Sequence, residues 1–129
     1  RVYPGVMEAL AALRARGLRT ACVTNKAERF TTPLLAKTGL AAHFEVVIAG
    51  DTVARGKPDP LPYATACARL GVAPAEALVV GDSENDAIAA RGAGCRVLCV
   101  TYGYTEGRPV EGIECDGLIG DLREVERHL

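Results

Sequence analysis

Short, predominantly apolar runs alternate with amphipathic segments along most of the chain. Four of these runs have the length of a β-strand: residues 18–23, 46–49, 77–80 and 95–100. Strands that are apolar on both faces and separated by helices are typical of a parallel sheet with helices packed on both sides. The pattern therefore predicts an α/β fold built on an open, doubly wound parallel sheet.

Helices are predicted before and between these strands. In residues 3–16, Val6, Leu10 and Leu13 recur at helical spacing, and Gly17 supplies a stop. The same reasoning predicts helices at residues 33–37, 63–70 and 87–91. The first of these should end at Gly39 and the last at Gly92 or Gly94.

The remaining segments are predicted as loops, apart from the C-terminus. Prolines exclude regular structure over much of residues 52–62, and residues 81–86 and 101–112 are polar or rich in turn-forming residues. Residues 118–119 are predicted as a last short strand. Asp121 and Glu124 have the spacing of a capping box, which predicts a final helix.

Three polar clusters follow three of the predicted strands. Thr24 and Asn25 follow the first, Lys57 lies beyond the second, and Asp82 and Asp86 follow the third. Functional sites of open α/β sheets lie at the carboxyl ends of the strands. The three clusters are therefore expected to converge on one edge of the sheet.

These residue types together suit a phosphate ester and a hard divalent cation. Thr24 and nearby backbone N–H groups can hold phosphate oxygens, and Lys57 can neutralise charge on those oxygens during phosphoryl transfer. Asp82 and Asp86 offer the oxygen ligands that Mg²⁺ prefers.

Each cluster also has a purely structural interpretation. Thr24 and Asn25 could form a turn or a helix cap, and Lys57 could be a solvated loop lysine. Asp82 and Asp86 could belong to a turn that caps a helix. The occurrence of all three clusters at strand ends, in this order, favours a functional site over three unrelated turns.

The same residues resemble three motifs of one enzyme superfamily. Val23-Thr24-Asn25-Lys26, Gly56-Lys57-Pro58 with Pro60, and the run from Gly81 to Asp86 look like motifs two, three and four of the haloacid dehalogenase superfamily. Tyr3-Pro4-Gly5-Val6 and Thr101-Tyr102-Gly103-Tyr104 are similar to phosphoglycolate phosphatases in particular. The likeness covers nearly the whole chain and identifies residues 1–129 as part of such a hydrolase core.

The resemblance implies a role for each candidate residue. Thr24 and Asn25 would bind the transferring phosphoryl group, and Lys57 would stabilise its negative charge. Asp82 would ligate Mg²⁺ directly, and Asp86 would orient Lys57 or a metal-bound water. The implied reaction is hydrolysis of a small phosphorylated organic acid, 2-phosphoglycolate, to glycolate and phosphate through an aspartyl-phosphate.

The first motif of the superfamily, Asp-x-Asp-Gly-Thr, does not occur in the sequence. Asp51-Thr52 and Asp116-Gly117 are its nearest fragments. In the superfamily this motif supplies the nucleophile and the central strand of a sheet ordered 5-4-1-2-3, and a helical cap usually follows it. The chain is therefore expected to lack that strand and the cap, and to be inactive by itself. A gap one strand wide, called the lane below, is expected between the strands predicted at residues 18–23 and 77–80. Its start at Arg1 rather than Met is consistent with a fragment or a processed chain.

Two other functions remain open at this point. One is a relative that acts on a different phosphomonoester, such as a sugar phosphate or pyrophosphate, or a mutase. The other is a non-catalytic binding module retained from a truncated enzyme. The missing cap would decide between substrates, and activity of the chain as given would argue against a binding module.

Composition and charge narrow the function classes further. At 129 residues the chain is one domain or a piece of one, and its formal net charge of −1 predicts no binding to nucleic acid or to an anionic membrane. No apolar run approaches the roughly 20 residues of a membrane-spanning helix, and no signal peptide opens the chain.

The cysteines are interpreted as packing residues. The five, at positions 22, 67, 95, 99 and 115, form no Cys-x-x-Cys pair, and their number is odd. Several lie in or beside apolar runs, where a thiol behaves as a small hydrophobic group. Free thiols favour a reducing compartment, so a cytoplasmic location is expected.

Overall fold

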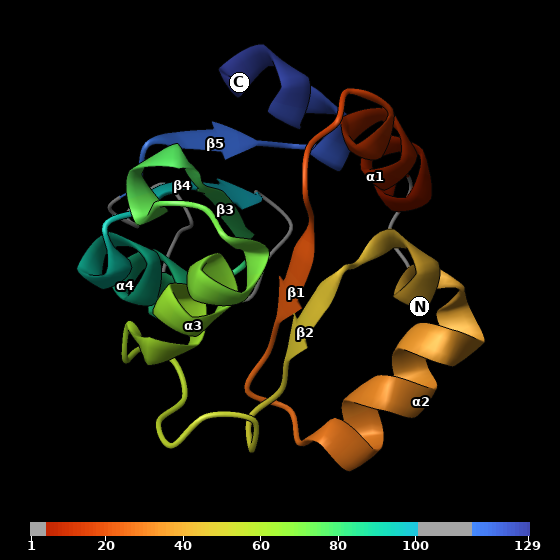
Figure 1. The fold of residues 1–129 in the computed structure, drawn as a ribbon. Coiled ribbons are helices and arrows are strands. Elements are labelled where there is room, and N and C mark those ends of the chain that lie inside the picture. The colour runs from red at the N-terminus through yellow and green to blue at the C-terminus, as the bar shows by residue number, and fades with distance from the viewer. Residues whose placement is uncertain (1–4, 101–114) are drawn as a thin grey trace.

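Two parallel sheets form the centre of the computed structural model, which describes residues 5–100 and 115–129 (Figure 1). In the first sheet, β1 (Ala21–Val23) pairs with β2 (Val46–Ile48). In the second, β4 (Arg96–Val100) lies between β3 (Leu78–Gly81) and β5 (Gly117–Ile119). All three pairings are parallel, as the apolar pattern predicted.

Helices lie on both sides of the β1–β2 sheet in Figure 1. The helices α3 (Leu61–Leu70) and α4 (Glu84–Ala93) pack against each other on one side; α3 contacts β1 and β2, and α4 contacts β3 and β4. The helices α1 (Val6–Ala15) and α2 (Glu28–Thr38) lie on the other side. This arrangement confirms the doubly wound α/β fold.

Among the described residues, three segments are 3₁₀ helices. They are η1 (Leu40–His43), η2 (Pro74–Glu76) and η4 (Leu122–His128). The first contacts α1 and α2, and the last packs against α1 and β5. The C-terminal segment therefore lies beside the first helix, as Figure 1 shows.

The two sheets do not pair with each other. Within the described residues, β1 pairs only with β2, and β3 pairs only with β4. This agrees with the expected lane between the two strands, because a missing central strand would leave β1 and β3 as second neighbours. Each of these strands thus has one edge without a strand partner in the part of the chain that the structure describes.

Several predicted boundaries are wrong. The strand predicted at 18–23 begins only at Ala21, because Leu18 is exposed and the Thr20 hydroxyl is bonded to the His43 carbonyl. The loop predicted at 81–86 ends early, since α4 begins at Glu84 rather than at residue 87.

Helix starts also shift. The second helix starts at Glu28 rather than near residue 33, and the first starts at Val6 rather than at residue 3. The C-terminal helix is 3₁₀ rather than α, although the capping box of Asp121 and Glu124 is present as predicted. The predicted stop at Gly39 is confirmed by its φ of 79°. The predictions for Tyr3, Pro4 and the loop at 101–112 concern residues outside the described ranges.

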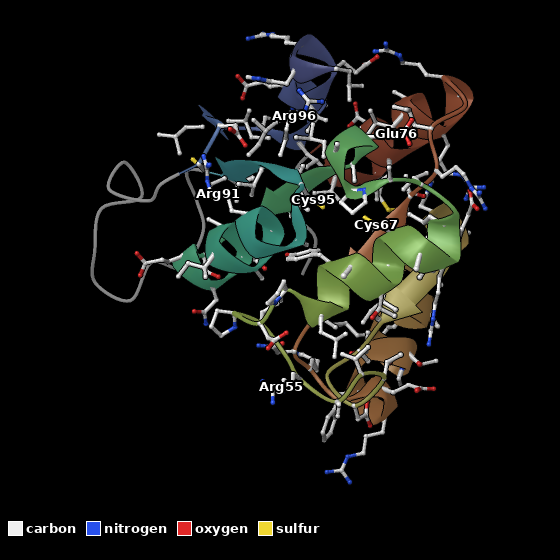
Figure 2. All side chains as sticks on the ribbon, turned by 60° about the vertical axis from the view of Figure 1, so that its left-hand side comes forward. Arg55, Cys67, Glu76, Arg91, Cys95 and Arg96 are labelled. Carbon is white, nitrogen blue, oxygen red and sulfur yellow. The ribbon has the colours of Figure 1, made fainter. Side chains whose placement is uncertain are left out.

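The cysteines pack as predicted, and those in or beside α3 and β4 are the most buried. Cys95 and Cys99 are at most 5% exposed and Cys67 is buried with them, whereas Cys22 is half-buried. Cys67 of α3 and Cys95, just before β4, have sulfur atoms 3.9 Å apart (Figure 2). Burial and then the neighbouring Cys67 raise the pKa of Cys95 to about 12, so it is held as a thiol.

No helix among the described residues is both long and apolar enough to cross a membrane.

Candidate active site

The structure brings the three polar clusters together. Thr24, Lys57, Asp82 and Asp86 line one cavity of about 370 Å³, and Val23 and Gly81 place it at the carboxyl ends of β1 and β3. The cavity thus lies where the lane between the two sheets opens. The strand-end rule predicted this convergence from the sequence.

Lys57 connects the two halves of the site. Its ammonium donates to Asp86 Oδ1 at 2.5 Å and to the Val23 carbonyl oxygen at 3.2 Å, so it contacts both β1 and α4. The ion pair is well shielded from water, with side-chain exposures of 13% for Lys57 and 5% for Asp86. An ammonium has three N–H donors. One donor thus remains beyond these two bonds, on a side chain that lines the cavity.

Asn25 holds the backbone of Lys57 rather than pointing at the cavity. Its side-chain oxygen accepts from the Lys57 N–H at 2.8 Å, and its amide nitrogen donates to the Lys57 carbonyl at 3.0 Å. Gly56 permits this approach, because a Cβ there would lie 2.6 Å from the Asn25 oxygen. The side chain of Asn25 is therefore occupied, which leaves its backbone N–H as the group that could meet a phosphate.

The Asp86 carboxylate is held by four donors. Oδ1 accepts from Lys57 and, at 2.7 Å, from the Tyr63 hydroxyl. Oδ2 accepts from the Asp82 backbone N–H at 3.0 Å and from the Ser83 hydroxyl at 3.3 Å. A direct bond from Asp86 to a metal ion would displace one of these donors.

Local sequence explains how Asp86 reaches this position. Ser83 is the N-cap of α4 and accepts from the Asp86 N–H, which places Asp86 in the first turn of the helix, pointing back toward the end of β3. Gly81 is needed beneath it, because a Cβ there would lie 2.4 Å from the Asp86 Cβ. The Gly-Asp-Ser-x-x-Asp spacing is thus a strand end, a cap and a first helical turn.

The two carboxylates of the site have opposite pKa shifts. Burial alone would raise the pKa of Asp86, but the charge of Lys57 and the bonds from Lys57 and Tyr63 lower it below the ordinary value. Desolvation and then the neighbouring Asp86 raise the pKa of Asp82. Burial and then Asp86 raise the pKa of Tyr63, so its hydroxyl keeps the proton that it donates.

Thr24 lies at the end of β1, on the wall of the cavity. Its Oγ1 accepts from the Lys26 N–H at 3.1 Å, which is the local turn that the structural interpretation described. Its own backbone N–H donates to the Ile48 carbonyl and continues the β1–β2 pairing. The hydroxyl proton of Thr24 is still able to meet an acceptor in the cavity.

The carboxylates fit a magnesium ion only with help from other ligands. Among the described residues, no group of three or more His, Cys, Asp or Glu side chains is arranged to hold an ion. Asp82 is exposed at the cavity and belongs to the hard oxygen donors that Mg²⁺ takes. One such carboxylate, with waters and a substrate phosphate, is a donor set that Mg²⁺ accepts.

Sequence reasoning missed some of the contacts at the site. The sequence predicts only that Tyr63 begins a helix, because an aromatic residue in an apolar helical segment gives no sign that its hydroxyl reaches Asp86. The Asp51 and Asp116 fragments have structural roles: Asp51 caps the N–H of Glu28 at 2.8 Å, and Asp116 accepts from Val97 at 2.7 Å.

Comparison with known proteins gives the class of the chain. Residues 1–94 match a model of the haloacid dehalogenase-like hydrolase family. The chain therefore belongs to the haloacid dehalogenase-like hydrolases.

More specific likeness is to phosphoglycolate phosphatases. A phosphoglycolate phosphatase of Thiobacillus denitrificans is 55% identical over 96% of this chain and 55% of its own length. A crystal structure of a predicted phosphoglycolate phosphatase from Haemophilus somnus is 37% identical, with a TM-score of 0.94 over 99% of this chain and 57% of that one.

A further similar structure was solved with a sugar phosphate. CbbY from Rhodobacter sphaeroides, in complex with xylulose-(1,5)-bisphosphate, is 32% identical, with a TM-score of 0.81 over 94% of this chain and 54% of that one. The chain spans about half the length of the curated relatives it matches.

Proposed function

We propose that the protein to which this chain belongs is a Mg²⁺-dependent phosphatase that hydrolyses 2-phosphoglycolate. The observation that carries the proposal is the shielded Lys57–Asp86 pair that lines the cavity together with Thr24 and Asp82. A positive charge, a hydroxyl and a hard carboxylate around one cavity suit a phosphomonoester. The likeness to phosphoglycolate phosphatases supports the substrate.

Each residue of the site would have a separate role in binding and transferring the phosphoryl group. Thr24 Oγ1 and the Asn25 backbone N–H would hold phosphoryl oxygens, and the remaining N–H of Lys57 would stabilise the charge that spreads over them. Asn25 and Asp86 would keep Lys57 in place. The Asp-x-Asp-Gly-Thr motif, which the resemblance implies for the nucleophile, would have to come from sequence outside these 129 residues.

Asp82 would hold Mg²⁺ when it is bound, and Asp86 would act through Lys57 or a water. The ion would supply positive charge and orientation for the phosphate oxygens. Because few oxygen ligands are fixed, Mg²⁺ binding by the 129-residue chain should be millimolar rather than micromolar. Calorimetry of the chain and of Asp82→Ala checks this. Micromolar affinity that Asp82→Ala abolishes would contradict an incomplete site.

A cytoplasmic location also belongs to the proposal. Two free cysteines whose sulfur atoms lie 3.9 Å apart in the core support a reducing compartment.

A second candidate is a sugar phosphate in place of 2-phosphoglycolate, favoured by the likeness to CbbY with its bound sugar bisphosphate. The test is phosphate release by the full-length protein with Mg²⁺ from 2-phosphoglycolate, pyrophosphate, a hexose phosphate and xylulose-1,5-bisphosphate. We expect the highest kcat/KM for 2-phosphoglycolate. A preference for either sugar phosphate would support the second candidate, and no release from any of them would overturn both.

The site itself is tested with Lys57→Met in the same protein. Removing a preorganised charge from an active site costs roughly a hundredfold or more in kcat. The matched control is Arg16→Met, which removes an exposed cation whose partner is Glu126 on the surface. Equal activity of both variants would show that Lys57 has no part in the reaction.

A further inference from the structure

We propose that Tyr63 is a positioning residue for the phosphatase reaction, acting through Asp86 to hold the Lys57 ammonium toward the cavity. The inference rests on the proposed function for its kinetic consequences and on the geometry of the described residues for its physical basis. No motif that the sequence shows includes this tyrosine.

Tyr63 touches both members of the ion pair. Its hydroxyl donates to the same Asp86 oxygen that accepts from Lys57, at 2.7 Å. The Lys57 nitrogen lies 5.7 Å from the centroid of the tyrosine ring, within the range of a cation–π contact. Tyr63 is only 7% exposed, so both contacts are shielded from water.

Tyr63 comes from a different element of the fold than Asp86 and Lys57, and this explains how it can fix their positions. Asp86 belongs to α4 and Lys57 to the loop after β2, whereas Tyr63 comes from α3, which packs against both α4 and the β1–β2 sheet. Without the hydroxyl, Oδ1 of Asp86 would be held by Lys57 alone, and only the two donors to Oδ2 would still fix the direction of the carboxylate. The hydroxyl therefore fixes the direction in which the remaining Lys57 N–H points.

The first test is Tyr63→Phe in the full-length protein, which keeps the ring and removes only the hydroxyl. We expect kcat to fall roughly tenfold, the size of one hydrogen bond to a charged group, with KM nearly unchanged. The matched control is Thr38→Val, which removes a hydroxyl bonded within α2, away from the cavity, and should leave both constants unchanged. Unchanged kcat in Tyr63→Phe would overturn the proposal.

A double-mutant cycle separates positioning from general packing. If Tyr63 acts through Asp86, adding Tyr63→Phe to Asp86→Asn should change kcat by less than about twofold, because the carboxylate it steers is already gone. The same tenfold loss in both backgrounds would show that Tyr63 works by another route and would overturn the proposal.

A spectroscopic readout needs neither activity nor a nucleophile. In the full-length protein, the Lys57 NH₃⁺ signal in ¹⁵N NMR should be visible because its protons exchange slowly, and Tyr63→Phe should speed that exchange roughly tenfold. Without any substitution, the Tyr63 hydroxyl proton should show a cross-peak to the Lys57 ammonium. Absence of that cross-peak, or unchanged exchange in Tyr63→Phe, would overturn the proposal. Absence of phosphatase activity in the full-length parent would instead overturn the proposed function.

Discussion

The two sheets differ in how completely they are buried. In the second sheet, Val97, Leu98, Cys99 and Val100 of β4 are each at most 4% exposed. In the first sheet every residue of β1 is half-buried, and only Ile48 of β2 is fully buried. The helix α2 beside it leaves Phe30 and Leu34 at 56% and 42% exposure.

The difference matters because the site draws on both sheets. Asp82 and Asp86 follow β3 of the three-stranded sheet. Thr24 and Asn25 follow β1 of the two-stranded sheet, and the Asn25 side chain holds the Lys57 backbone through two hydrogen bonds, called the Asn25 clamp below. Among the described contacts at the cavity, the Lys57–Asp86 bond joins the two. The carboxylate side of the site thus belongs to the sheet with the buried central strand β4, but β3, which carries Asp82, is half-buried like β1. Both strands border the lane between the sheets, so both sides of the site depend on what fills it.

The largest effect should come from filling that lane. A longer form of the protein, with an upstream segment that pairs with both β1 and β3, should be several kcal/mol more stable than the 129-residue chain, since each buried, unpaired backbone group costs about 1–3 kcal/mol. Urea unfolding of the two forms measures the difference. Cooperative transitions with the same midpoint would show that no central strand is missing.

A matched pair of leucines measures the contrast in packing. Leu98→Ala, at 1% exposure in β4, should lower the free energy of unfolding by about 3 kcal/mol through lost burial and a new cavity. Leu34→Ala, at 42% exposure on α2, should cost less than about 0.5 kcal/mol. Urea unfolding of both variants checks the pair. Equal losses would mean that the two halves are packed alike.

Breaking the bond between the halves should have an intermediate effect. Lys57→Met leaves the Asp86 carboxylate buried without its cation, which should cost about 2 kcal/mol. The exposed pair of Arg16 and Glu126 gives the comparison, because Arg16→Met should cost less than about 1 kcal/mol. Chemical denaturation at neutral pH distinguishes them, and a Lys57→Met variant as stable as the parent would contradict a structural role for the pair.

The smallest effect is a dependence of stability on pH. The pKa of Asp86 is lower in the folded than in the unfolded state, so its contribution is present above the ordinary carboxyl pKa of about 4 and is lost as the pH falls below that value. Asp82, whose pKa is raised, acts in the opposite sense. Urea midpoints between pH 7 and 3 should therefore fall less steeply for Asp86→Asn than for the parent. Identical slopes would show that Asp86 has no net part in acid unfolding.

The pattern of residues along the chain is enough to predict the class of fold and the place of the site. Apolar runs fix which segments are buried strands, and parallel strands bring their carboxyl ends to one edge, so Thr24, Lys57 and Asp82 could be brought together without coordinates. The capping box of Asp121 and Glu124 could also be predicted from the sequence, because it depends only on two residues three positions apart.

Contacts between residues far apart in the sequence could not be predicted from local pattern and are known only from the tertiary structure. The Thr20 hydroxyl, just before β1, is bonded to the carbonyl of His43 in η1, 23 residues away. The Asn25 clamp on Lys57 and the Tyr63 bond to Asp86 join residues 32 and 23 positions apart. Such contacts depend on how the sheets and α3 pack in space. Residue type and spacing along the chain do not predict that packing.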